Sequence, residues 1–277
     1  MCIRDSGVTA AKGFMASGIH CGIRKNQTKK DLAMIKSENL CSAAAVYTQN
    51  KVYGAPITVT RNNISDGYAQ AVIVNSGNAN TCNSDGVLKA EMMCDIAANA
   101  LSVDKKDVIV ASTGVIGMSL DVTPIANHAE KLASQMSADG GNDAAFAIMT
   151  TDTIPKECAV QIEIGGKAVT LGACCKGSGM IHPNMATMLV FITTDAAISP
   201  ELLHKALYSD AQKSFNMISI DGDTSTNDMV SVMANGMAGN EEITCEGADF
   251  DEFCKALNAV TCLLYTSPSP RDATLSR

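Results

Sequence analysis

The chain has 277 residues, of which 46% are hydrophobic and 18% are charged, and this composition is typical of a folded globular protein. Its formal net charge of -8 argues against a binding surface for nucleic acid or for an anionic membrane, because phosphate groups are bound by concentrated Lys and Arg. No apolar run approaches the length of a membrane span and the N-terminus lacks the apolar segment of a secretory signal, so we expect a cytoplasmic protein with a small-molecule partner.

The first elements alternate between short apolar runs and turn residues. The runs Ala43–Tyr47, Ile57–Thr60 and Ala71–Asn75 are rich in apolar or β-branched residues, and clusters with Gly, Asn or Pro separate them, so each is predicted to be a strand. Residues Gly86–Leu101 follow with apolar positions close to one helical face, which predicts the first helix.

The next predicted strand, Asp107–Ala111, leads directly into Thr113 and Gly114. A rigid strand end of this kind can present a hydroxyl group and a closely approaching backbone N–H to an oxyanion. Taken alone, however, the turn also fits a purely structural role, in which Gly114 serves only the backbone conformation.

The remaining elements continue the alternation. Thr123-Pro124 and Ser199-Pro200 each place a capping residue before a proline, as helix starts do. Further predicted elements are a helix to about Met136, a hairpin of Ala159–Ile164 and Lys167–Ala173 around Gly165-Gly166, a helix after Pro200, a strand Met229–Ala234 and a helix Phe250–Val260. Because the hairpin excludes a purely parallel sheet, we expect a layered α/β sandwich with mixed or antiparallel strands.

The two ends of the chain differ from the rest. Residues 1–6 and 262–277 lack periodicity and resemble in-frame translations of sequencing adapters, so we interpret both as non-native ends.

The eleven cysteines include no C-x-x-C pair and read as reduced, mostly buried thiols. Cys174 and Cys175 lie close in sequence to a candidate site, but they end an apolar strand-like stretch and are predicted to pack in the core.

The run KGSGMIHPNMATML, from Lys176 to Leu189, places Thr187 between a glycine-rich loop and an apolar strand, Met188–Thr194. Such a loop can be bent against the strand, so that the Thr187 hydroxyl attacks the carbonyl of Ala186 and the chain cleaves itself. The amine of the freed Thr187 would then act as general base for its hydroxyl. The alternative is an ordinary glycine-rich turn before a buried strand.

Several blocks in order resemble the ornithine acetyltransferase family, the glutamate N-acetyltransferases of arginine biosynthesis. They are AAKGFMASGIHCGIRK, DLAMIKSE, VNSGNAN, ASTGVIG, IMTTDTIPK, the run around the Ala-Thr junction, and IDGDTSTND. The resemblance implies a Thr187 nucleophile freed by cleavage after Ala186, and an oxyanion hole that includes Thr113 and Gly114. It also implies substrate contacts from Thr153, Lys176 and Thr187.

The resemblance divides the chain into an α chain, residues 7–186, and a β chain, residues 187–261, that lacks its C-terminal part. The family continues beyond the last helix with further substrate-binding residues, where this chain has LLYTSPSPRDATLSR. The implied reaction moves an acetyl group from N-acetylornithine to glutamate and needs no metal or organic cofactor, although acetyl-CoA is a possible second donor. The family also implies self-association of two α/β protomers.

Two other classes of protein remain open. An amidase or aminopeptidase with an N-terminal nucleophile would cleave itself in the same way but let water deacylate Thr187. An inactive fragment or a binding protein would stay in one piece.

Two further features near the junction are assigned no chemical role. The loop IDGDTSTND spaces Asp221, Asp223, Ser225 and Asn227 like a calcium loop, but it lacks the glycine and the closing glutamate of such loops, so a polar turn is expected. His182 is an accessory at most, because a free threonine amine needs no other base.

Overall fold

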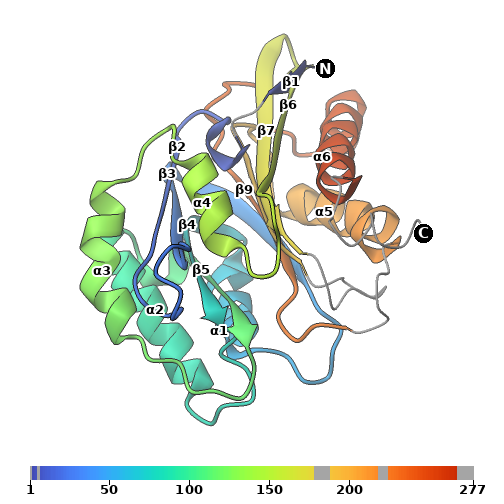
Figure 1. Ribbon diagram of the computed structural model, residues 1–277. Helices are drawn as coiled ribbons and strands as arrows, with labels where there is room; N and C mark the ends of the chain where they lie inside the picture. The colour runs from blue at the N-terminus through green and yellow to red at the C-terminus, as the bar shows by residue number, and fades with distance from the viewer. Residues whose placement is uncertain (1, 5–6, 178–187, 218–223, 267–277) are drawn as a thin grey trace, which may run out of the picture.

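The computed structural model describes residues 2–4, 7–177, 188–217 and 224–266, which form a mixed α/β fold (Figure 1). The strands are β1 Cys2–Arg4, β2 Phe14–Ile19, β3 Leu32–Tyr47, β4 Tyr68–Asn78, β5 Val108–Val115, β6 Lys156–Ile164, β7 Lys167–Lys176, β8 Leu189–Thr194 and β9 Met229–Ala234. The helices are α1 Ala55–Asn63, α2 Gly86–Leu101, α3 Thr123–Ser134, α4 Gly141–Ile148, α5 Pro200–Lys213 and α6 Ala248–Thr266, with short 3-10 turns at Gly7–Thr9, Ile64–Asp66, Lys105–Asp107 and Phe215–Met217.

The described strands form one sheet in the order β1-β6-β7-β8-β9-β3-β4-β5, and β2 pairs with β3 beside this path. The pairs β4·β5 and β8·β9 are parallel and the others are antiparallel, which confirms the predicted mixed sheet. The long strand β3 joins the two halves of the sheet. Its first part pairs with β2 and β4, its second part pairs with β9, and its register with β4 shifts between Lys36 and Cys41.

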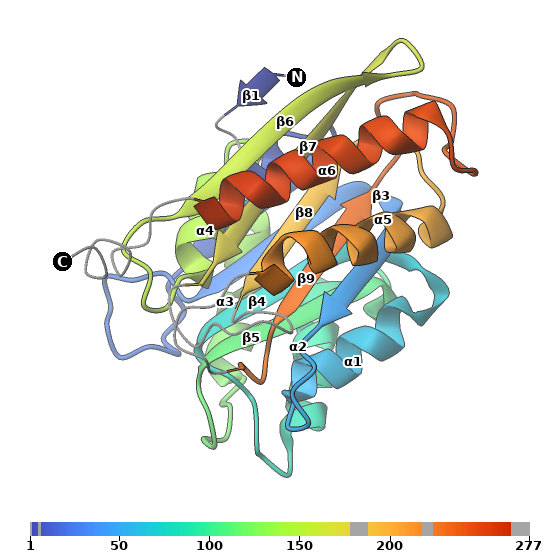
Figure 2. The same ribbon diagram turned by 90° about the vertical axis from the view of Figure 1, so that its right-hand side faces the viewer.

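Helices cover the sheet as separate layers. Helices α5 and α6 lie side by side across the β6 to β9 half and bury one core there (Figure 2). Helices α2 and α3 pack on the half that contains β4 and β5, and bury a second core. A third core lies between the two halves and includes α4, so the fold is layered as the alternation of elements predicts (Figure 1).

Most predicted elements after residue 67 are confirmed. The helix Gly86–Leu101 and the strand Met229–Ala234 have the predicted bounds, and Ser199 caps α5 by accepting a hydrogen bond from the N–H of Leu202. The hairpin turns through Gly165 and Gly166, which both have positive φ, as a two-residue turn of this kind requires.

One prediction is wrong: the run Ile57–Thr60 belongs to helix α1 and is not a strand. Pro56 stands in the first turn of this helix, where a missing N–H costs nothing, and the buried side chains of Ile57 and Thr60 lie one helical turn apart. Packing on the neighbouring strand therefore outweighs the preference of β-branched residues for strands.

Other elements differ from the sequence interpretation in extent. Strand β2, helix α4 and the first part of β3 were not predicted, and α3 begins with Thr123 inside the helix, while Val122 occupies the capping position. Helix α6 continues beyond the predicted Val260, and Leu264 in its last turns is buried.

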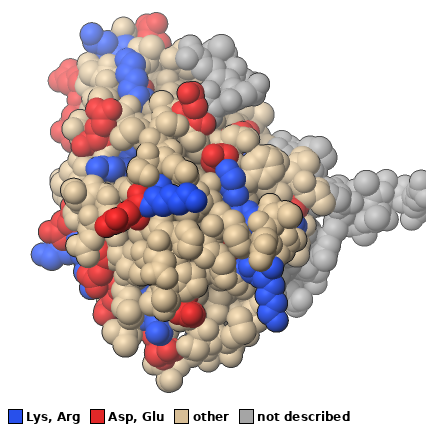
Figure 3. All heavy atoms as spheres, turned by 60° about the vertical axis from the view of Figure 1, so that its left-hand side comes forward, with Lys and Arg blue, Asp and Glu red and all other residues tan. Residues whose placement is uncertain are grey.

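Basic and acidic side chains are interspersed on the face of the molecule shown in Figure 3. In the part of the chain that the structure describes, none of the helices combines the length and the hydrophobicity that crossing a membrane requires.

Candidate active site

Two glycines bring the ends of neighbouring strands into close contact. Gly77 of β4 lies opposite Gly114 of β5, and both have a φ of +132°, which side chains disfavour. A Cβ on Gly114 would lie only 2.3 Å from the carbonyl carbon of Gly77. Glycine is therefore required at Gly114, directly after Thr113, at the strand end that the sequence singles out.

Lys176 and Thr113 are brought together, although they belong to different halves of the sheet. Lys176 is the last residue of β7 and only 4% of it is exposed. Its Nζ donates a hydrogen bond to Thr113 Oγ1 at 3.0 Å and contacts Thr150 Oγ1 at 3.4 Å. Burial lowers the pKa of the Lys176 ammonium, against the charges of Asp152 and Asp228, which raise it. Lys176 is thus a buried group of this site and not a solvated surface lysine.

A buried ion pair of Asp152 and Lys156 lies beside these hydroxyl groups. Lys156 Nζ is 2.8 Å from Asp152 Oδ1, and their side chains are 6% and 1% exposed. The same Oδ1 accepts the N–H of Gly177 at 2.9 Å, and Lys156 donates to the Gly177 carbonyl at 2.6 Å. Burial would raise the pKa of the Asp152 carboxyl, but the hydrogen bond and charge of Lys156 and the N–H of Gly177 hold it below its usual value.

A second carboxyl group, Asp228, directly precedes β9 and lies beside Met188, the residue before the neighbouring strand β8. Its Oδ1 accepts the N–H of Met188 at 3.0 Å, and Met188 in turn accepts the N–H of Met229 at 3.0 Å. Asp228 is 1% exposed, and its Oδ2 has no hydrogen-bond partner among the described residues. Burial raises the pKa of the Asp228 carboxyl well above its usual value, although the charge of Lys176 opposes this.

The predicted nucleophile Thr187, the junction residue Ala186 and His182 lie outside the described residues. The described chain stops at Gly177 and resumes at Met188, and Lys176 is paired with Leu189 in neighbouring antiparallel strands. Both flanks of the junction run are therefore held at one end of the sheet, close to Lys176 and Thr113.

Thr153, the other predicted substrate contact, is exposed and follows Asp152. The hydroxyl group that meets Lys176 belongs to Thr150, and sequence reasoning missed it together with Asp152, Lys156 and Asp228. The block IMTTDTIPK was the available signal for the first three, but nothing in it distinguishes a buried carboxylate from an exposed one.

The loop that resembles a calcium site is only partly described, because Asp221 and Asp223 lie outside the described residues. The described Asn227 is held by the protein itself. Its Oδ1 accepts from Thr81, and its Nδ2 donates to the carbonyls of Ala79 and Ser112. Among the described residues, no group of three or more His, Cys, Asp or Glu is placed to hold a metal ion.

Cys174 and Cys175 are buried to 0% and 1% exposure, which confirms that they pack in the core. Burial raises the pKa of Cys175 to about 12 and raises that of Cys174 well above its usual value. Burial therefore disfavours the thiolate that a cysteine nucleophile requires.

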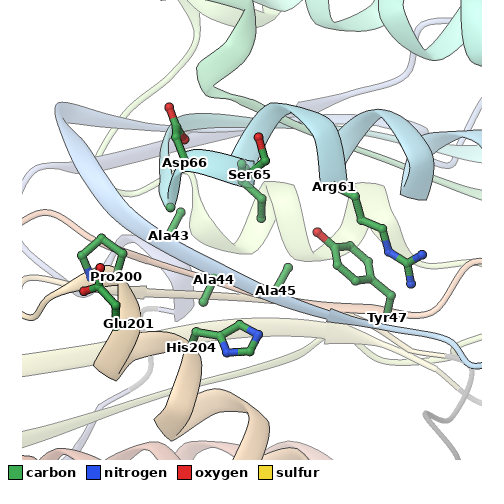
Figure 4. Close-up of a pocket in the computed structure, with 12 residues that line it drawn as sticks. Ala43, Ala44, Ala45, Tyr47, Arg61, Ser65, Asp66, Pro200, Glu201 and His204 are labelled. Carbon is green, nitrogen blue, oxygen red and sulfur yellow. The ribbon is translucent and has the colours of Figure 1, made fainter.

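A separate cavity of about 350 Å³ lies over β3, between the Ile64–Asp66 turn and α5 (Figure 4). Arg61 and His204 line it together with Asp66 and Glu201. The guanidinium of Arg61 stacks on the Tyr47 ring, with Cζ 4.7 Å from its centre. The cavity shares no lining residue with the cluster around Lys176.

Comparison with known proteins gives a consistent family. A model of the ArgJ family matches residues 15–267. The arginine biosynthesis bifunctional protein ArgJ of Symbiobacterium thermophilum is 51% identical over 256 residues, which are 92% of this chain and 64% of that protein. This chain therefore spans less than two thirds of the length of that relative.

Solved structures support the same relationship. The arginine biosynthesis bifunctional protein of Bacillus halodurans superposes with a TM-score of 0.62 at 42% identity, over 67% of this chain and 98% of that one. The ornithine acetyltransferase of Mycobacterium tuberculosis, solved with ornithine, gives a TM-score of 0.60 at 31% identity, over 68% and 99%. An aminopeptidase of Ochrobactrum anthropi, described as a variant of the Ntn hydrolase fold, gives 0.55 at 13% identity over 94% and 84%, which concerns the fold alone.

Proposed function

Because this chain belongs to the ArgJ family, we propose that its full-length protein is a glutamate N-acetyltransferase that moves the acetyl group of N-acetylornithine to glutamate. The relatives are named as bifunctional proteins of arginine biosynthesis, and one relative was solved with ornithine, which is the product of the first half of this reaction. The activity is a proposal for the whole protein, since this chain spans 64% of the length of its relative.

The observation that carries the proposal is the hydrogen bond of 3.0 Å from Lys176 to Thr113, beside Gly114. It joins two of the residues that the family resemblance assigns to the site. Lys176 Nζ donates this bond, so Thr113 Oγ1 accepts it and keeps its own hydrogen for another acceptor. A hydroxyl group oriented in this way, next to a glycine N–H, suits the stabilisation of an oxyanion.

Self-cleavage would supply the nucleophile. The Thr187 hydroxyl oxygen attacks the carbonyl carbon of Ala186, the peptide C–N bond breaks, and the hydroxyl proton passes to the leaving nitrogen, which becomes the free amine of Thr187. Water then hydrolyses the resulting ester, which leaves the Ala186 carboxylate and an N-terminal Thr187 with a free hydroxyl group. The division into an α chain, 7–186, and a β chain from Thr187 to about Thr261 is part of this proposal.

Acetyl transfer then follows a ping-pong course. The Thr187 amine takes the proton of the Thr187 hydroxyl as its oxygen attacks the acetyl carbonyl, and Thr113 with Gly114 stabilises the oxyanion. Ornithine leaves with the proton, and the amine of glutamate attacks the acetyl ester, which regenerates the Thr187 hydroxyl.

Thr153 and Lys176 are proposed to contact the substrate, and no metal or organic cofactor takes part. We also propose two associated α/β protomers in the cytoplasm, and acetyl-CoA as a possible second donor.

A hydrolase with the same nucleophile is the second candidate, because the aminopeptidase of O. anthropi shares the fold. The two candidates differ in the acceptor that removes the acyl group from Thr187. Without glutamate, a transferase releases at most one equivalent of ornithine per active site as the acetyl-threonine forms, whereas a hydrolase continues to release ornithine and acetate without any amine acceptor.

The test uses the full-length gene product. Denaturing electrophoresis with mass spectrometry should find two pieces that meet between Ala186 and Thr187, and N-acetylornithine turnover should depend on glutamate. The Thr187→Ala variant should show neither cleavage nor turnover. An uncleaved wild-type protein that still transfers acetyl groups would refute the proposal.

A further inference from the structure

The ion pair of Asp152 and Lys156 bonds directly to two segments of the candidate site, the loop at Thr150 and the chain after β7 at Gly177. Both oxygens of Asp152 are used: Oδ1 accepts from Lys156 and from the N–H of Gly177, and Oδ2 accepts the N–H of Thr150 at 3.3 Å. Thr150 Oγ1 in turn contacts Lys176 Nζ, which bonds Thr113. A continuous chain of contacts therefore leads from the ion pair to the predicted oxyanion donor.

The pair also holds Gly177, the last described residue before the Ala186–Thr187 junction. Gly177 uses both of its backbone groups on this pair, since its N–H is bonded to Asp152 and its carbonyl to Lys156. Lys156 starts β6 and lies opposite Cys175 in the ladder with β7, so its ammonium reaches Gly177 from a rigid neighbouring strand. The last residues of β7 are thus held by backbone pairing with β6, and Gly177, which follows β7, is held by two charge-assisted hydrogen bonds.

Stability alone is a poor reason for such a pair. Two charges lose their hydration when they are buried, and well-packed apolar residues in their place often give equal or greater stability. A buried pair whose hydrogen bonds among the described residues go to neighbouring site residues has a clearer use in fixing their geometry.

We propose that Asp152 and Lys156 are positioning residues for the oxyanion side of the active site: they hold Thr150 and Gly177, and through them Lys176 and Thr113. The inference rests on the proposed function and deepens it, because one oxyanion hole would serve both self-cleavage and acetyl transfer. Neither residue touches the substrate in this scheme, so their loss lowers the rate of both steps and affects substrate binding only through Lys176.

The chain offers a matched control in Asp195, which follows β8 at the end remote from Leu189. Asp195 is 0% exposed, and like Asp152 it accepts backbone N–H groups, from Thr170 at 2.7 Å and from Lys12 at 3.2 Å. Asp152→Ala and Asp195→Ala therefore remove the same kind of group, but only the first removal reaches the candidate site.

The experiment compares these two variants in the full-length protein made by cell-free synthesis. The rate of cleavage is followed by the appearance of the two fragments, kcat and KM for N-acetylornithine are measured on fully cleaved protein, and thermal melting reports stability. Asp152→Ala should slow cleavage and lower kcat by roughly 10- to 100-fold, because small misplacements of reacting groups have effects of this size. KM should change less than kcat, because the pair affects substrate binding only through Lys176. Asp195→Ala should melt at a lower temperature and keep rates close to the wild type where it is folded.

Two further variants separate position from stability. Asp152→Asn keeps an oxygen that can accept from Gly177, so it should recover part of the rate. The double variant Asp152→Ala with Lys156→Met removes both buried charges, so it should recover stability without recovering the rate.

Wild-type rates in Asp152→Ala, or an equal loss of rate in Asp195→Ala, would overturn the inference. If the double variant regained its rate together with its stability, the pair would be merely structural. Wild-type protein that never cleaves would instead contradict the proposed function, so the two failures are distinguishable.

Discussion

Lys176 and Thr113 meet across the end of the sheet, with 3.0 Å between Nζ and Oγ1, although 63 positions of sequence separate them. The contact is possible because β7 and β5 both end at this side of the molecule, and because Lys176 is too buried to extend into solvent. Because Thr113 Oγ1 accepts the bond from Lys176, the contact restricts the direction in which the Thr113 hydroxyl can donate its own hydrogen. The role of this site therefore depends on the Thr113 hydroxyl and on the backbone at Gly114 that holds it.

Replacement of Thr113 by Val should remove the proposed oxyanion donor and leave the shape of the side chain unchanged. Loss of one such donor lowers kcat by about 10²- to 10³-fold in enzymes of this kind. We expect a decrease of this order in acetyl transfer and slower self-cleavage, measured on the full-length protein. Thr113→Ser keeps the hydroxyl group and is the matched control. Equal activities of the two variants would show that the hydroxyl group takes no part.

Replacement of Gly114 by Ala should destabilise the fold as well as the site. The new Cβ would lie 2.3 Å from the carbonyl carbon of Gly77, at a φ of +132°. Backbone strain of this type costs about 1–3 kcal/mol, and the contact adds to it, so urea unfolding should show a loss of at least this size. Gly117→Ala is the control: its φ is +79°, but its Cβ would meet no atom within 4 Å. Equal losses in both variants would mean that the close approach to Gly77 is unimportant.

The sequence predicts the layered α/β class and most of the later elements, because their periodicity and caps agree with their packing. It fails at α1, where the β-branched residues of Ile57–Thr60 suggest a strand although Pro56 marks a helix start. It also misses α4, a short helix whose buried face is mainly alanine. Short elements such as these are decided by what they pack on, which local pattern does not contain.

The residues of the candidate site also fall into those that the sequence predicts and those that it does not. Thr113 and Gly114 can be singled out as a strand end, and the family resemblance adds Lys176. Asp152 and Lys156 have no local signal, because their importance comes from burial and from Gly177, which lies 21 positions beyond Lys156. Contacts of this kind appear only when β6 and β7 are paired in three dimensions.

Thiol labelling should separate the core cysteines from the surface ones. Cys82 and Cys245 are exposed, whereas Cys174 and Cys175 are buried, and burial raises the pKa of Cys175 to about 12. Iodoacetamide at pH 8 should therefore modify Cys82 and Cys245 in the folded protein and spare the adjacent pair, as peptide mass spectrometry would report. After denaturation in urea all four should react. Rapid labelling of Cys174 or Cys175 in the native state would contradict this prediction and make that residue a candidate thiol nucleophile.

The buried carboxyl of Asp228 should make stability fall as the pH rises from about 4. Burial raises the pKa of Asp228 in the folded protein above its value in the unfolded chain, so between these two values the folded state binds more protons. Unfolding therefore becomes easier with increasing pH, by up to about 1.4 kcal/mol per unit. Asp228→Asn removes this titration and keeps an oxygen for the N–H of Met188. With Thr187→Ala as a common uncleaved background, the difference in unfolding free energy between Asp228→Asn and Asp228 should grow in favour of Asn as the pH rises above about 4. A difference that is independent of pH would mean that Asp228 is ionised in the folded protein, as the charge of Lys176 favours.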